Sequence, residues 1–132
     1  MLVNRSMPTD VLVPVLCYPS VSEAVNWLTR AFGFTLRWQV GEHRAQLGVG
    51  PSAALAVTRG DPIPGSDHVM VRVEDIHEHR DRAAAAGADV GEVAEFPFGE
   101  QQYTAVDLVG RAWVFTQTIS DVAPEEWGGR TG

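Results

Sequence analysis

The stretch Asp67-His68-Val69-Met70-Val71-Arg72-Val73-Glu74-Asp75 decides how the second half of this chain folds. Its valines alternate with a histidine, a methionine and an arginine, which is the period-two pattern of a strand with one apolar and one mixed face. A helix is predicted to follow, because Asp75 can cap it, residues 76–86 are rich in helix formers and Gly87 ends it. We therefore predict a strand with a covered apolar face and a mixed face available for binding.

The same plan appears 54 residues earlier. Residues 11–18 predict a strand, Ser20-Val21-Ser22-Glu23 matches a helix-capping box, and the helix that follows ends at Gly33. With this offset Gly87 falls on Gly33 and His68 falls on Pro14. Because proline has no amide hydrogen to donate, the first strand is predicted at a sheet edge or a distorted position. The chain thus predicts one strand-helix-strands unit written twice.

Further strands complete each unit. The predicted strands are residues 34–40, 43–49, 53–58, 89–96, 101–107 and 111–118. Residues 60–65 hold two glycines and two prolines, which disfavour helix and strand interiors and predict a linker. We predict an α+β fold of two βαβββ modules that form curled mixed sheets within a single domain. Module one is expected at about 11–58, the linker at 59–66, module two at about 67–118 and a C-terminal tail at 119–132.

Composition limits the class of protein. With 132 residues and 45% hydrophobic content, the chain can bury one ordinary core or two half-cores. It has no apolar run of membrane-spanning length, and its first residues lack the order of a secretory signal, so we expect a cytoplasmic protein with no membrane partner. One cysteine, Cys17, excludes an internal disulfide; we expect a small core residue there, with a reactive thiol as the alternative.

The charge is negative and unevenly spread. The net charge is −7, with +2 over residues 1–60 and −9 over the remainder, and every basic residue is an arginine. Nucleic acid is not an expected partner, because phosphate binding requires clustered basic residues. The negative charge is compatible with a cationic ligand, or serves only to keep the protein in solution.

Motif searches exclude some chemistries. No phosphate-binding loop with the pattern Gly-x-x-x-x-Gly-Lys and no Gly-x-Ser-x-Gly elbow is present, so nucleotide hydrolysis and acyl transfer are not expected. His77-Glu78-His79 is not a metal motif, because residues two apart on a helix point to different sides; we expect a solvated face there. His68 is either a hydrogen-bonded wall residue or a ligand. Six of the aromatic residues are either core residues or cavity walls: Tyr18, Trp38, Phe98, Tyr103, Trp113 and Phe115.

Three segments together resemble the vicinal oxygen chelate superfamily, which includes glyoxalases, extradiol dioxygenases and bleomycin-resistance proteins. They are AVNWLTRAFGF at 24–34, DHVMVRVEDI at 67–76 and AVDLVGRAWVFTQ at 105–117. The resemblance covers about residues 11–118 and includes the Asp107-Leu108-Val109-Gly110 turn before the last strand. It implies that each module curls into a half-barrel.

In enzymes of that superfamily, a divalent metal is held by His or Gln from the first strand and Glu from the last strand of each module. Carried over by position, His68 matches the first-strand ligand of module two, and Pro14 occupies the equivalent position in module one. The last-strand positions fall near Thr58 and at Val114, neither of which is a carboxylate. A site with one ligand of four does not hold such a metal, so the resemblance favours the metal-free, bleomycin-resistance-like branch, whose members are acidic dimers that sequester a cationic, aromatic drug.

The first hypothesis is therefore a metal-independent protein that binds a small cationic or aromatic molecule, such as an antibiotic, as a homodimer without a cofactor or catalytic residues. Its predicted ligand-binding residues are Trp38, His68, Met70, Arg72, Tyr103, Trp113 and Thr116. The alternative is a metal-dependent glyoxalase-like lyase, isomerase or dioxygenase that uses His68 and replacements such as Glu100, Gln101 or Tyr103. A third hypothesis is a regulatory or interaction domain that only keeps the fold.

Overall fold

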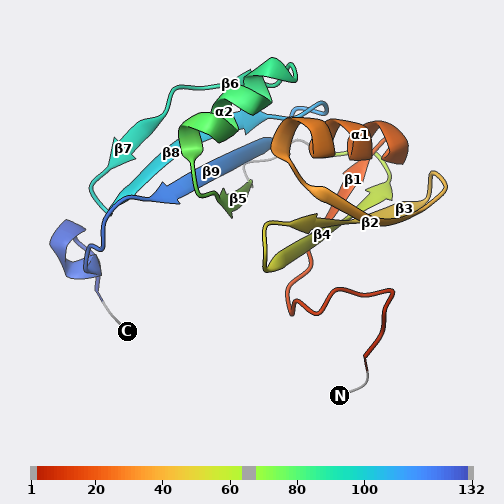
Figure 1. Ribbon diagram of the computed structural model, residues 1–132, viewed down its shortest axis with the longest axis horizontal. Coiled ribbons are helices and arrows are strands. Elements are labelled where there is room, and N and C mark those ends of the chain that lie inside the picture. Colours follow the sequence, from red (N-terminus) through yellow and green to blue (C-terminus); the bar gives the residue numbers. More distant parts are fainter. Residues whose placement is uncertain (1–2, 64–67, 131–132) are drawn as a thin grey trace. The chain divides into compact units, whose positions relative to one another are not determined.

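The computed structural model of the chain describes residues 3–63 and 68–130. The chain forms two compact units, Met1–Pro64 and Gly65–Gly132, which we call module one and module two. Each holds one α-helix beside one sheet (Figure 1). The start of the predicted strand at Asp67 lies outside the described residues. The grouping of both modules in a single domain stays a prediction.

Module one has the element order predicted from the sequence. Its elements are β1 (Val15–Tyr18), α1 (Val21–Phe32), β2 (Thr35–Val40), β3 (Arg44–Val49) and β4 (Ala53–Arg59). The strand order is β1-β4-β3-β2, with β1 parallel to β4 and the other pairs antiparallel. As Pro14 predicted, β1 lies at an edge of the sheet. β1 is shorter than the predicted strand at residues 11–18, since it begins only at Val15. Val11 and Leu12 lie before it and are exposed.

Helix α1 follows from its predicted capping signals. The Ser20 side chain accepts a hydrogen bond from the Glu23 amide over 3.2 Å, and Gly33 ends the helix with a φ of 76°. Apolar residues at helical spacing give the buried stripe, which consists of Val21, Ala24, Val25, Leu28, Ala31 and Phe32. Leu47, Leu55 and Val57 of the sheet are buried as well, so module one has a core of its own.

Module two repeats the arrangement with one change. Its elements are β5 (Val69–Arg72), α2 (Ile76–Ala85), β6 (Asp89–Val90), β7 (Ala94–Phe96), β8 (Glu100–Val106), β9 (Ala112–Thr118) and the 3-10 helix η1 (Pro124–Trp127). The strand order is β5-β9-β8-β6, and β7 also pairs with β8. The predicted strand at 89–96 is thus two strands: Val90 pairs with Ala105 and Ala94 with Gln102, so the β6–β7 side carries one residue more than β8, as in a bulge.

The internal repeat is confirmed. β1 and β5 begin 54 residues apart, each lies at a sheet edge, and each runs parallel to the last strand of its module. The two βαβββ modules therefore form the predicted α+β fold with mixed sheets, but these are open sheets of four and five strands and not the curled half-barrels expected. No helix in the described part of the chain is long and apolar enough to cross a membrane.

Candidate ligand-binding face of module two

Strand register sorts the residues of module two onto two faces of its sheet. Met70 pairs with Val114 and Arg72 with Thr116 across β5 and β9. Across β8 and β9, Thr116 also pairs with Gln102. Because residues directly opposite each other in a sheet point to the same side, they form one face. We call it the open face, and it consists of Met70, Arg72, Glu100, Gln102, Thr104, Val114 and Thr116.

Helix α2 covers the other face. Tyr103, Trp113 and Phe115 alternate with the open-face residues and are at most 2% exposed. The His79 ring of α2 lies 4.1 Å from the Phe115 ring, and its Nδ1 lies 2.6 Å from the Tyr103 hydroxyl. Burial raises the pKa of the Tyr103 phenol above its usual value, an effect that the charge of Arg80 partly opposes. The open face is therefore the side of the sheet away from α2.

The prediction of a solvated face around His77-Glu78-His79 is wrong for His79. His77 and Glu78 are exposed, but His79 is half-buried against the two aromatic rings. Arg80 is half-buried too, and its Nε donates to the Gly91 carbonyl over 2.7 Å. A polar side chain can face a core where a buried hydroxyl such as that of Tyr103 gives it a hydrogen-bond partner.

A hydrogen-bonded chain of polar groups crosses the open face. The Thr116 hydroxyl donates to Glu100 Oε1 over 2.7 Å and accepts from Gln102 Nε2 over 3.2 Å. Thr116 is only 4% exposed, whereas Glu100 and Gln102 are partly exposed. The buried hydroxyl thus holds a carboxylate and an amide in fixed positions while both keep polar atoms for another partner.

The structure brings some of the predicted site residues together and separates others. Met70, which is 53% exposed, lies on the open face with Arg72 and Thr116, and His68 is exposed directly before β5. Tyr103 and Trp113 lie on the face that α2 covers. In module one, Trp38 is half-buried, and its Nε1 donates to the Ser6 carbonyl over 3.1 Å. Ligand contacts by any of these residues stay predictions.

Sequence reasoning missed Gln102, and it considered Glu100 only as a replacement metal ligand. Glu100, Gln102 and Thr104 occupy every second position of β8, so the period-two pattern places all three on one face. Which face this is depends on the pairing with β9, where Gln102 lies opposite Thr116. Alternation along β8 therefore predicts which residues share a face. The pairing with β9 is needed to decide which side of the sheet that face is on.

Comparison with known proteins identifies the superfamily to which this fold belongs. The profile of the Glyoxalase/Bleomycin resistance protein/Dioxygenase superfamily matches residues 11–115, and the chain belongs to this superfamily. The crystal structure of TioX from Micromonospora sp. ML1 is 36% identical, with a TM-score of 0.68 over 81% of this chain and 97% of TioX. No protein of curated function matches the sequence significantly.

Two structures at lower identity share the fold. One is a bleomycin resistance determinant encoded on the transposon Tn5, at 16% identity and a TM-score of 0.69, covering 83% of this chain and 98% of that one. The other is the fosfomycin resistance protein FosX from Listeria monocytogenes, at 12% identity and a TM-score of 0.70, covering 91% of this chain and 98% of FosX. A mutant of the Listeria FosX has been crystallised with Mn(II) and 1S,2S-dihydroxypropylphosphonic acid, so a protein of this fold can bind a metal.

The residues of this chain do not fit such a metal. The carbonyl of Pro14 accepts the Ala56 amide over 2.8 Å, and the proline side chain offers no ligand. Val114 is apolar, and Arg72 brings a positive charge to the same face. Within residues 3–63 and 68–130, no three His, Cys, Asp or Glu side chains gather closely enough to hold a metal ion.

Proposed function

We propose that this protein binds a small organic molecule on the open face of module two, without a metal ion and without converting it, as an antibiotic-sequestering protein does. The observation that supports this most directly is the Glu100–Thr116–Gln102 chain beside the exposed Met70. Small-molecule sites combine apolar walls with a few fixed polar groups, and this face holds both. Resistance proteins for bleomycin and fosfomycin share the fold.

The residues suggest the class of ligand. Glu100 offers a carboxylate to a cationic group, and the net charge of −9 after residue 60 attracts cations over a longer range. Met70 and Val114 offer apolar surface, and the Arg72 guanidinium can stack on a planar ring. A planar or aromatic molecule with a positive charge satisfies these groups, and Thr116 keeps the polar ones in place.

A second surface is needed to enclose the ligand. One sheet face can cover only one side of a molecule, whereas small-molecule sites usually bury most of the ligand. We propose a homodimer, the commonest closed assembly of soluble proteins, in which a second copy supplies further walls. Trp38 and His68 remain the aromatic and imidazole groups proposed to contact the ligand, whereas Tyr103 and Trp113, at most 2% exposed, would contribute only by supporting the sheet behind the open face. Light scattering that gives the mass of one chain in the presence of ligand would contradict this assembly.

The test is a calorimetric titration with bleomycin and a panel of cationic, planar antibiotics. Thr116→Val keeps the shape of the side chain and removes the hydroxyl that orients Glu100, so we expect at least about tenfold weaker binding. Thr35→Val is the matched control, because Thr35 is exposed on β2 in module one. No binding by any compound contradicts antibiotic sequestration, and equal weakening by both variants contradicts the site.

The second candidate is a metal-dependent lyase, isomerase or dioxygenase that uses His68. It is favoured by the exposed position of His68 directly before β5, at the first-strand ligand position of the superfamily. The test is elemental analysis of protein purified without a chelator. About one equivalent of a transition metal, lost in His68→Ala, would support the enzyme; no metal in either protein would leave the binding protein as the better proposal.

A further inference from the structure

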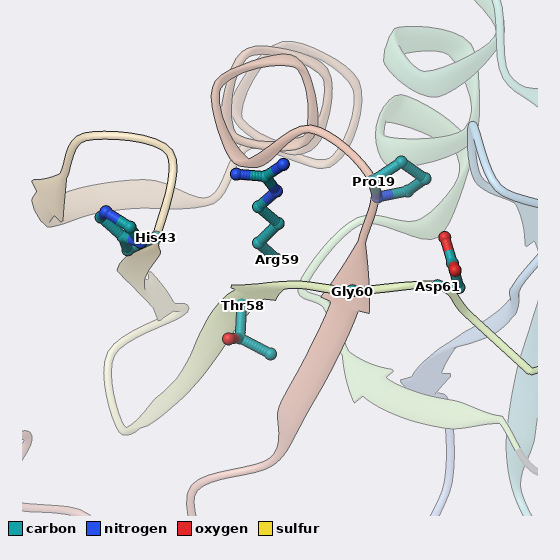
Figure 2. Close-up of a pocket in the computed structure, with 6 residues that line it drawn as sticks. All are labelled: Pro19, His43, Thr58, Arg59, Gly60 and Asp61. Atoms are coloured by element: carbon teal, nitrogen blue, oxygen red, sulfur yellow. The ribbon is translucent and has the colours of Figure 1, made fainter.

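A hollow in module one lies at the ends of β1 and β4, beside the turn that joins β2 and β3. It measures about 670 Å³ and is lined by Pro19, His43, Thr58, Arg59, Gly60 and Asp61 (Figure 2). All six residues belong to module one. We infer that this hollow binds the phosphate or carboxylate group of a small metabolite, with Arg59 and His43 as the groups that hold the anion.

The backbone fixes these two side chains next to each other. The Arg59 amide donates to the His43 carbonyl over 3.2 Å, which ties the β2–β3 turn to the end of β4. The Gly60 amide donates to the Tyr18 carbonyl over 3.0 Å, which ties β4 to the end of β1. Figure 2 shows the Arg59 side chain between His43 on one side and Pro19 and Asp61 on the other, while Thr58 points the opposite way. Backbone hydrogen bonds therefore hold three separate segments together around the base of the Arg59 side chain.

The Arg59 guanidinium is available for a ligand. Its side chain is exposed and makes no hydrogen bond or ion pair with any residue in the described ranges. Asp61 is the one carboxylate among the lining residues, and it does not approach within ion-pairing distance of Arg59. A guanidinium presents a planar fork of donors that matches the two oxygens of a carboxylate or phosphate. An oxyanion is therefore the class of group that completes this site.

The carboxylate of the neighbouring Glu42 is already engaged in hydrogen bonds within the protein. Glu42 precedes His43, but its carboxylate accepts hydrogen bonds at the start of α1, from the Ser20 hydroxyl and the Ser22 amide over 3.2 Å each, and also from the Ser22 hydroxyl. These contacts satisfy the helix N-terminus, which is therefore not the anion site. They also hold the negative charge of Glu42 against the positive end of the helix.

The charge of the module supports the same ligand class. Residues 1–64, which make up module one and include Asp61, carry a net charge of +1 in a chain of net charge −7. His43 and Arg59 line the hollow, whereas Arg44 pairs with Thr58 and points to the other side of the sheet. The basic side chains that line the hollow therefore favour an anion there.

The test is an NMR titration of the full chain with inorganic phosphate and, in a separate arm, with succinate. We expect saturable shifts at the amides of His43, Arg59 and Gly60, and the probe that binds more tightly shows whether phosphate or carboxylate is preferred. Arg59→Gln should weaken binding at least about tenfold, because it removes a charge-assisted contact. Asp61→Asn should tighten binding, because it removes the nearby negative charge.

The matched control is Arg30→Gln, which removes the same charge from an exposed position on α1. It should change the affinity less than about twofold, since exposed charges at a distance are screened. Equal weakening by Arg30→Gln and Arg59→Gln would mean a general electrostatic attraction and would overturn the site. Shifts that do not saturate with either probe would overturn it as well.

Discussion

The indole Nε1 of Trp113 donates to Oδ2 of Asp107 over 3.0 Å, and both side chains are buried. The other carboxylate oxygen of Asp107 accepts the backbone amides of Val109 and Arg111 over 3.0 and 2.9 Å. One side chain therefore shapes the turn before β9 and holds the largest ring of the module two core. The Asp-x-x-Gly turn is thus a structural element of this chain.

Asp107→Ala should lower the free energy of unfolding by about 2–4 kcal/mol, because it leaves buried donors without an acceptor. Urea denaturation followed by tryptophan fluorescence measures this change. Asp121→Ala removes an exposed carboxylate and should stay within about 0.5 kcal/mol of the wild type. A loss below about 1 kcal/mol for Asp107→Ala would contradict the role assigned to the carboxylate.

Tyr103→Phe should change how stability depends on alkaline pH. Burial holds the pKa of the folded Tyr103 phenol above its ordinary value of 10.0, so the folded state keeps a proton that the unfolded state releases. This contribution is fully present below about pH 10, and above it the free energy of unfolding falls by about 1.4 kcal/mol per pH unit. The chain has no lysine, so few other groups titrate in this range.

The Tyr103→Phe variant also loses the contact with His79, so it should be about 0.5–1.5 kcal/mol less stable near neutral pH. Its stability should fall less steeply above about pH 10 than that of the wild type, and the difference between the two should shrink. Chemical denaturation at a series of pH values measures both curves. Parallel curves above that pH would contradict a raised pKa for Tyr103.

Ser22→Ala should raise the pKa of Glu42. Hydrogen bonds from the Ser22 side chain and then the Ser22 amide lower the Glu42 pKa below 4.5. Because the folded pKa is lowered, the stabilisation by this carboxylate is present above about pH 4.5 and is lost as the pH falls through the folded value. Carboxyl ¹³C NMR titration measures the pKa, and Ser52→Ala, at an exposed serine, is expected to leave it unchanged.

Gly99→Ala should destabilise module two more than Gly110→Ala. Both glycines have left-handed backbones, with φ values of 82° and 84°, so alanine strains each by about 1 kcal/mol. A Cβ at Gly99 would lie 2.4 Å from the Ser120 carbonyl oxygen, whereas one at Gly110 would meet nothing within 4 Å. Thermal and urea unfolding should show a larger loss for Gly99→Ala, and equal losses would contradict the close approach of the segment after β9.

The features that the sequence predicted well depend on short-range signals. Ser20 and Gly33 bound α1 because a side-chain cap and a left-handed residue act within one helical turn. The strand β5 could be predicted from alternation, and the edge position of β1 from Pro14. The superfamily could be recognised from short segments as well, since these include the helix end at Gly33 and the Asp107–Gly110 turn.

The features that it did not predict depend on partners far along the chain. The break between β6 and β7 lies where Gly91 donates to the Thr104 carbonyl, a pairing with no local signal. His79 faces the core because Tyr103 provides a partner 24 residues away. Trp113 and Val114 had to point oppositely, but only the position of α2 decides which of them is covered. The hollow around Arg59 joins residues from three elements, which no single pattern contains.

The alternation along β9 separates two kinds of evolutionary change. Trp113 and Phe115 are fully buried, so substitutions there are constrained by the stability of module two. Val114 and Thr116 alternate with them on the side away from α2. A randomised library at Met70, Arg72 and Val114 should therefore yield many folded variants with new ligand preferences, whereas a library at the intervening positions should yield few. In such a fold, substitutions on the open face can change which molecules are bound while the buried residues preserve the fold.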